Sequence, residues 1–291
     1  MPATNETETT DILLSNDLQH EFTLKENEMK REKLKKEFEK QALVKQQRQT
    51  KIILSVIILF LSIIALLIYR SRKIIYKEKK RSDELLLNIL PEEVAEELKN
   101  TGSSDAKQYT DVTVMFTDFK DFSQISEKLS PKKLVSEIHY CFKAFDDIIT
   151  KYNIEKIKTI GDSYMCVGGL PVINNTNAVD VVKAALEIRD FMNQRNREVD
   201  HEKFEIRIGV HTGPVVAGIV GIKKFAYDIW GDTVNIASRM ESSGEAGKVN
   251  ISGTTFELVK DKFRCVHRGK IHAKNKGDFD MYFVERSLGE V

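Results

Sequence analysis

The chain has 291 residues, a formal net charge of +1 and three cysteines, Cys141, Cys166 and Cys265, with no CxxC spacing. A nearly neutral chain has no bulk attraction to nucleic acid, and these cysteines indicate neither a zinc ribbon nor a disulfide framework. The length allows one good-sized domain plus appendages. We therefore expect no nucleic-acid partner and a reducing compartment.

The first 51 residues are polar. Residues 1–20 are rich in Thr, Asn, Asp and Glu and contain no Lys or Arg, a composition typical of a disordered N-terminus. Residues 21–51 alternate in charge and are strong helix formers, but their apolar positions are too sparse for a confident coiled coil. The pattern predicts a charged, solvated helix there.

Residues 52–69 form an uncharged apolar run of 18 residues. That length is sufficient for a helix to cross a hydrocarbon core of about 30 Å. The 15 residues before the run carry four Lys or Arg and the 15 after it carry seven, so the positive-inside bias places the C-terminal part in the cytoplasm. We predict one transmembrane helix in a lipid bilayer, the plasma or inner membrane of the cell; a buried helix of a soluble protein is the alternative.

Residues 70–107 read as a juxtamembrane helix and a transducing linker, interrupted at Pro91. From residue 108 to 286, apolar runs of strand and helix type alternate, which predicts an α+β domain whose helices cover a mainly antiparallel sheet. The expected strands are Val112–Phe116, Ile154–Ile160, Tyr164–Gly168, Phe204–Val210, Val215–Val220, Val249–Ser252 and Met281–Glu285, and the expected helices are Pro131–Tyr152, Ala178–Asn196, Thr233–Glu241 and Thr254–Lys260.

Two aspartates stand where strands end. Asp118 follows the run VTVMF, and Asp162 lies in a Gly161-Asp162 hairpin signal between two β-type runs. Carboxylates on rigid strands can hold a pair of Mg²⁺ or Mn²⁺ ions against a polyphosphate. Ordinary turn chemistry, in which Asp accepts from nearby backbone N–H groups, is the alternative.

Two further segments point to phosphate chemistry. The loop from Phe119 to Ser123 runs from Asp118 into a helix-like segment, so its backbone N–H groups can bind phosphate without the lysine of a P-loop, whose GxxxxGK[ST] pattern is absent. Asn235 and Arg239 are four apart on a predicted helix and therefore share one face. A guanidinium there can donate to a phosphate that is losing its leaving group.

The motifs FTDF, KTIGDSYM, GVHTGPVVAG and FAYDIWGDTVNIASRMES occur in this order, and the stretch from about Gln108 to Arg286 resembles the catalytic domain of class III nucleotidyl cyclases. The resemblance implies a ferredoxin-like palm fold, an active site at a dimer interface, and conversion of a nucleoside triphosphate to a 3′,5′-cyclic monophosphate and pyrophosphate. LLLNILPEEVAEEL resembles the transducing helix that precedes such domains. Some relatives carry an arginine where this chain has Pro214, so a phosphate contact from that point is in doubt.

The resemblance also implies a role for each matching residue. Asp118 and Asp162 fall on the metal-binding aspartates, with two ions per site, and Asn235 falls on the ribose-orienting asparagine. Arg239 falls on the transition-state arginine, and Lys274 on the lysine that contacts the terminal phosphates.

Lys158 and Asp228 fall on the two positions that distinguish purine bases in the family. Adenine offers an acceptor at N1 and a donor at its 6-amino group, which a donating lysine and an accepting carboxylate can match. Relatives that use GTP tend to carry a glutamate and a cysteine-type residue there. The pair therefore predicts ATP as substrate; a plain surface ion pair is the alternative.

Together these residues predict a membrane-anchored adenylate cyclase whose homodimer forms two sites, each with Asp118 and Asp162 from one copy and the remaining residues from the other. A guanylate cyclase is one alternative, and a catalytically silent dimerisation or sensing module is another. A diguanylate cyclase or polymerase shares the palm chemistry, but the hairpin reads IGDSYM rather than GGDEF.

Overall fold

The computed structural model describes residues 5–198, 202–221, 225–273 and 277–288. The chain divides into two units, Met1–Arg81 and Ser82–Val291, which are described separately below.

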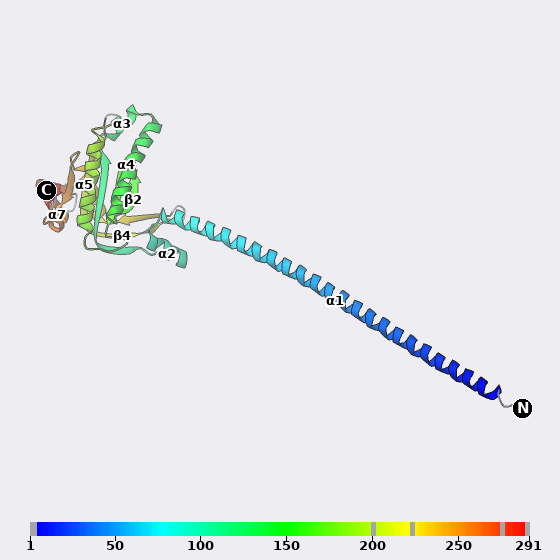
Figure 1. Ribbon diagram of the computed structural model, residues 1–291. Helices are drawn as coiled ribbons and strands as arrows, with labels where there is room; N and C mark the ends of the chain where they lie inside the picture. Colours follow the sequence, from blue (N-terminus) through cyan, green and yellow to red (C-terminus); the bar gives the residue numbers. More distant parts are fainter. Residues whose placement is uncertain (1–4, 199–201, 222–224, 274–276, 289–291) are drawn as a thin grey trace. The chain divides into compact units, whose positions relative to one another are not determined.

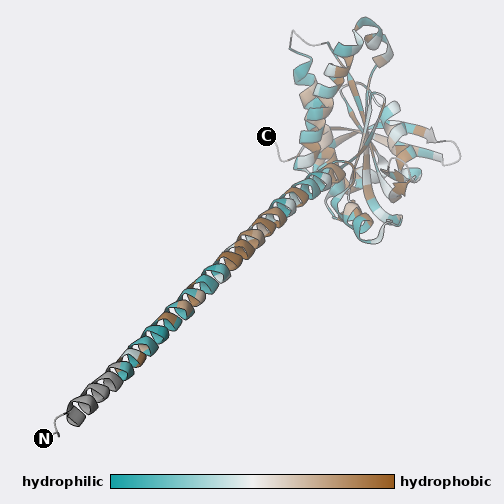
Figure 2. Ribbon diagram, turned by 90° about the vertical axis from the view of Figure 1, so that its right-hand side faces the viewer, coloured by the Kyte–Doolittle hydropathy of each residue, from teal (hydrophilic) through white to brown (hydrophobic). Residues whose placement is uncertain are grey.

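The first unit is helical. Helix α1 runs from Asn5 to Leu87 without a break and includes residues whose composition is typical of disorder. No glycine or proline occurs between these bounds, and nothing in the sequence stops a helix once it has formed. Figure 2 shows a hydrophobic band along α1 between more polar stretches. By length and composition α1 can cross a membrane, and no part of its most apolar 18-residue window is buried.

The second unit contains the sheet and the remaining helices. Its helices are α2 (Glu92–Thr101), α3 (Phe122–Lys128), α4 (Pro131–Lys151), α5 (Asn177–Arg195), α6 (Asp232–Ser242) and α7 (Gly253–Val259). Its strands are β1 (Lys107–Phe119), β2 (Glu155–Ile160), β3 (Ser163–Gly168), β4 (Ile206–Val220), β5 (Ala226–Trp230), β6 (Val249–Ser252), β7 (Phe263–Ala273) and β8 (Gly277–Ser287).

The strands form one sheet in the order β2-β3-β1-β4-β6-β8-β7, with β5 paired to β4 outside this path. Among the pairs that the structure describes, only β4 with β6 is parallel. The predicted α+β class with a mainly antiparallel sheet is therefore confirmed. Strand β1 pairs with β3 as far as Thr117 and with β4 as far as Phe119, so it lies inside the sheet and Asp118 is held by β4.

Apolar side chains of β1 are buried on both faces of the sheet. Met115 and Phe119 belong to a core formed with α4 and α5, the two helices that lie along one face of the sheet in Figure 1. Val114 and Phe116 belong to a second core, which includes residues of α2 and β5. Burial on both faces explains why the strand reads as a continuous apolar run.

Buried hydrogen bonds between side chains link β4 to β6 and α7. His211 Nδ1 lies 2.7 Å from Ser252 Oγ, and Thr212 Oγ1 lies 3.1 Å from Thr255 Oγ1. The His211 side chain is almost fully buried, and this desolvation lowers the pKa of His211 to about 4. The imidazole is therefore neutral at physiological pH.

The predicted elements differ from the structure in a few places. The two strands expected on either side of Gly213-Pro214 are one strand, β4, although both residues weaken strands elsewhere. The structure also contains β5 and β7, which the predicted strands do not include, and α3 where the sequence predicts a helix-like segment after the loop from Phe119 to Ser123. Cys141 and Cys166 are buried, Cys265 is half-buried, and all three are free thiols, as their spacing indicates.

Candidate active site

Asp118 and Asp162 lie close together at the end of the sheet where β1 and the β2–β3 hairpin terminate. Thr117 pairs with Tyr164 across β1 and β3, and Ser163 Oγ donates to the Thr117 carbonyl at 2.9 Å. The hairpin turn has Gly161 at φ 64°, a conformation that glycine adopts without strain. Burial, and then the negative charge of Asp118, raise the pKa of Asp162. The two carboxyl groups are therefore within electrostatic reach of each other.

The same cluster contains two residues that the sequence did not single out, Arg207 and Glu241. Arg207 lies directly opposite Asp118 in the β1–β4 register, and its Nη2 donates to Asp118 Oδ2 at 2.7 Å. Its Nε lies 3.0 Å from Glu241 Oε1, at the end of α6. The Arg207 guanidinium thus joins a carboxylate of β1 to a carboxylate of α6.

Glu241 is held in this position by a close approach between α6 and β4. A Cβ atom on Gly209 would lie 1.9 Å from the Glu241 backbone nitrogen, so only glycine fits there. The Glu241 side chain is 9% exposed. Burial and the nearby negative charge of Asp118 raise its pKa to about 7, against the opposing effect of Arg207.

The loop after Asp118 has the expected course into a helix, with one correction. Strand β1 ends at Phe119, Asp121 has φ 56°, and α3 begins at Phe122. The Phe119 side chain is 2% exposed and stacks in the aromatic core, so only its backbone is available to a ligand. Ser123 is exposed in the first turn of α3.

Lys158 and Asp228 come together from β2 and β5. Lys158 Nζ lies 2.5 Å from Asp228 Oδ2, and Asp228 Oδ1 accepts from the backbone N–H of Ile229 at 2.9 Å. The two side chains are 42% and 18% exposed, so the pair faces solvent on one side. The structure shows the ion pair that the simpler interpretation expects, and it brings together the two groups that the resemblance assigns to the base.

Asn235 and Arg239 project from successive turns of α6, Asn235 exposed and Arg239 half-buried. Within the part of the chain that the structure describes, no acidic side chain forms an ion pair with Arg239. Pro214 lies in β4, and its carbonyl accepts from Thr233 Oγ1 at 2.7 Å. Lys274 lies outside the described residues.

The donor set fits divalent cations that a nucleotide helps to bind. Among the described residues, no group of three or more His, Cys, Asp or Glu side chains is placed to hold a metal ion. Mg²⁺ is usually bound through one or two carboxylates together with substrate phosphates, and Asp118 and Asp162 supply that number. The Asp118 carboxylate already accepts a hydrogen bond from Arg207, so a bound ion shares this carboxylate with the guanidinium.

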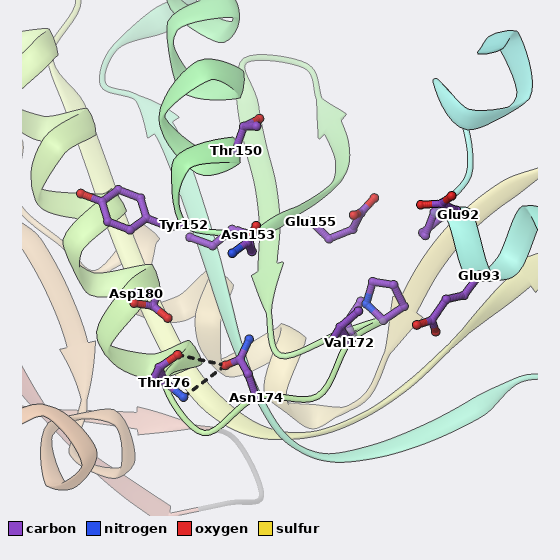
Figure 3. Close-up of a pocket in the computed structure, with 14 residues that line it drawn as sticks. Glu92, Glu93, Thr150, Tyr152, Asn153, Glu155, Val172, Asn174, Thr176 and Asp180 are labelled. Carbon is purple, nitrogen blue, oxygen red and sulfur yellow. Dashed lines mark hydrogen bonds between the residues drawn. The ribbon is translucent and has the colours of Figure 1, made fainter.

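A cavity of about 720 Å³ lies elsewhere in the second unit. Figure 3 shows Glu92 and Glu93 at the start of α2 on one side and Asn174, Thr176 and Asp180 on the other. Burial raises the pKa of Glu155, which also lines it. None of the predicted site residues lines this cavity, so we do not assign the active site to it.

Residues 104–286 match the family model of the adenylate and guanylate cyclase catalytic domain. This match covers more than half of the chain and includes the carboxylate cluster, the Lys158–Asp228 pair and α6. The chain belongs to this family, the class III nucleotidyl cyclases, as its motifs indicate.

Individual relatives carry both substrate types in their names. The chain is 40% identical over 219 residues to atrial natriuretic peptide receptor 2 of Homo sapiens, covering 74% of this chain and 20% of the receptor. Its second unit resembles the catalytic core of a rhodopsin-guanylyl cyclase with converted specificity in complex with ATPalphaS (36% identity, TM-score 0.60, 62% of this chain and 98% of that one). It also resembles the adenylyl cyclase CyaB from P. aeruginosa (31% identity, TM-score 0.60, 65% and 100%). The chain spans about a fifth of the length of the receptor.

Proposed function

We propose that the chain is an adenylate cyclase that converts ATP to 3′,5′-cyclic AMP and pyrophosphate. The observation that carries this choice of base is the Lys158–Asp228 pair, with Nζ and Oδ2 2.5 Å apart. Lys158 can donate to N1 of adenine, and Asp228 can accept from the 6-amino group. A base with the opposite pattern leaves polar groups unpaired, which can change selectivity by several orders of magnitude.

Other side chains have roles in the same reaction. Asp118 and Asp162 hold the divalent cations, Asn235 orients the ribose, and Arg239 donates to the phosphate as charge develops on it. Two ions of Mg²⁺ or Mn²⁺, when bound, lower the pKa of the 3′-hydroxyl and neutralise the leaving pyrophosphate. The backbone of the loop from Phe119 to Ser123 and the side chain of Lys274 contact the phosphates.

The reaction site is shared between two copies of the chain, each copy contributing the metal carboxylates to one site and the other residues to the second. Exposed apolar side chains near both groups support this arrangement: Ile160 precedes the Asp162 turn, Val220 ends β4, Phe225 precedes β5 and Trp230 ends it. Single exposed apolar residues are ordinary, but several near one edge are typical of an interface.

In this proposal, residues 52–69 of α1 cross the bilayer once and residues 70–107 connect that helix to the catalytic domain, residues 108–286, in the cytoplasm. The apolar window of α1 and the larger number of cations after it support this placement. Resistance of the full chain to alkaline extraction from membranes would test the anchor.

The test of substrate choice is a competition. The purified chain is incubated with Mn²⁺ and equal concentrations of ATP and GTP, and the cyclic product is identified by mass. We expect cyclic AMP, and a shift toward cyclic GMP in the double variant Lys158→Glu with Asp228→Cys. Lys156→Glu is the matched control, because Lys156 lies on the same strand and pairs with Asp146 instead. Cyclic GMP as the main product of the unmodified chain would refute the proposal.

Guanylate cyclase is the second candidate, and the names of several relatives favour it. Guanylate cyclase soluble subunit beta-2 of Rattus norvegicus is 40% identical over 212 residues, and guanylyl cyclase C of Homo sapiens is 39% identical over 218. Sequence identity over the whole domain indicates a shared type of reaction, whereas the choice of base depends on a few side chains. The competition experiment separates the two candidates directly.

A further inference from the structure

The Arg207 guanidinium occupies the position between the metal carboxylate of β1 and the buried carboxylate at the end of α6. We propose that Arg207 is a positioning residue that competes with a divalent cation for Asp118, and that Glu241 sets the strength of this competition. This inference rests on the proposed function, because it assigns Asp118 to a metal ion.

Geometry makes the competition unavoidable. Arg207 and Asp118 are directly opposed on neighbouring antiparallel strands, so their side chains leave the same face of the sheet. The Nη2–Oδ2 distance of 2.7 Å is that of a charge-assisted hydrogen bond. A cation bound to Asp118, at Oδ2 or at the neighbouring Oδ1, therefore shares the carboxylate with the positive charge of the guanidinium.

Glu241 provides the alternative partner for the guanidinium. Its Oε1 lies 3.0 Å from Arg207 Nε, and its backbone is fixed against Gly209 of β4. The side chains of Arg207 and Asp118 are 27% and 22% exposed, whereas that of Glu241 is only 9% exposed. When Asp118 turns to a cation, Arg207 can keep its ion pair with the more buried Glu241 instead of losing both partners.

The ion pair with Glu241 also connects Arg207 to the helix that carries Arg239. Glu241 lies two residues after Arg239 on the same helix, α6. In a shared-site dimer, Arg239 acts in one site while Asp118 of the same copy acts in the other. The Asp118–Arg207–Glu241 contacts therefore link the metal carboxylate to the helix that carries Arg239.

The test measures cation binding as well as activity. Mn²⁺ binding to the full chain in detergent, without nucleotide, is measured by the loss of the free-ion signal in electron paramagnetic resonance, together with the melting temperature with and without Mn²⁺. Arg207→Gln should bind Mn²⁺ more tightly, on the order of 5- to 10-fold, and should gain more melting temperature from Mn²⁺ than the unmodified chain. Arg264→Gln is the matched control, because Arg264 forms an exposed ion pair with Glu285.

Glu241→Gln should have the opposite effect and weaken Mn²⁺ binding, because Arg207 then has Asp118 as its main partner. The double variant separates this route from simple loss of a negative charge. If Glu241 acts through Arg207, replacing Glu241 in the Arg207→Gln background should change Mn²⁺ affinity much less than it does alone.

Two outcomes overturn the inference. The first is an unchanged or weaker Mn²⁺ affinity in Arg207→Gln while Asp118→Asn abolishes binding, which leaves the proposed metal site intact and refutes only the role of Arg207. The second is Mn²⁺ binding that does not depend on Asp118, or that stays absent when a non-reactive ATP analogue is added, which refutes the metal assignment together with the inference. A purely structural role for Arg207 predicts an equal loss of melting temperature with and without Mn²⁺, and it belongs to the first case.

Discussion

Replacement of Gly209 by alanine tests how strongly catalysis depends on the close packing of α6 against β4. The added Cβ would lie 1.9 Å from the Glu241 nitrogen and 2.4 Å from its Cα, and both are backbone atoms that no rotamer change can move. The last turn of α6 would have to retreat by about 1.5 Å to reach the 3.4 Å at which ordinary contact begins. Overpacking of this kind typically costs about 1–3 kcal/mol of stability.

Gly209→Ala should also reduce turnover. Arg239 lies one residue before Met240, which the same Cβ also approaches, so its guanidinium moves with the displaced turn. A misplacement of about 1 Å near the reacting groups can reduce turnover on the order of 100-fold. Gly253→Ala is the matched control, because its nearest neighbour would lie at 3.5 Å. Urea unfolding gives the stability and cyclic-nucleotide production gives kcat; wild-type values of both in Gly209→Ala would refute this reasoning.

Three further predictions concern the metal site, its sharing between copies and the buried histidine. Asp118→Ala should abolish cyclic AMP formation at saturating Mg²⁺ or Mn²⁺, and retained turnover would refute the metal role. Mixed dimers of Asp118→Ala and Arg239→Ala copies, each inactive alone, should recover activity through one intact site; confirmed mixed dimers without activity would exclude the shared geometry. The pKa of His211 is about 4 when folded and close to 6.5 when unfolded, so its contribution to stability is present above about pH 6.5 and falls as the pH drops toward 4. Urea unfolding should show that this group lowers the free energy of unfolding by about 2 kcal/mol between pH 7.5 and pH 5.0. His211→Gln should remove this pH dependence, whereas the control His139→Gln, at an exposed position, should keep it. Equal pH profiles for all three proteins would contradict the low pKa of His211.

The strands that carry the aspartates can be predicted from sequence because their signal is local. The run before Asp118 is apolar on both faces, and Gly161-Asp162 is a strong hairpin pattern between two β-type runs. The helix with Asn235 and Arg239 is likewise visible from its spacing. These elements are formed by residues that are adjacent in the chain.

The strands that the predictions missed have weak sequence signals of their own and form by pairing with the strand next to them in the chain. Strand β5 has five residues with Asp228 at its centre, and it forms only by pairing with β4. Strand β7 contains several charged residues, and it is stabilised by β8 along ten paired positions. Their own propensity is weak, so tertiary pairing decides.

Arg207 and Glu241 escaped prediction for the same reason. An arginine that alternates with apolar residues in a strand reads as a solvent-facing position, and a glutamate in the last turn of a helix reads as a surface charge. Their importance appears only once the register places Arg207 opposite Asp118 and Gly209 brings α6 onto β4. Cross-strand register is set by the whole sheet, and no single segment encodes it.

In the proposed adenylate cyclase, substrate selectivity depends on the order of Lys158 and Asp228 along the edge of the base as well as on their chemistry. Guanine also has an acceptor, O6, and a donor, N1–H, but in the reverse order along its edge, so Lys158 and Asp228 could match it only if they exchanged places. The Asp228 carboxylate is fixed by the backbone N–H of Ile229 at 2.9 Å, whereas Lys158 reaches it on a long, flexible side chain. In this proposal the fixed carboxylate of Asp228 sets the position of the base, and the flexible Lys158 side chain adjusts to it. For this reason a change at position 228 should alter the choice between ATP and GTP more than a change at position 158.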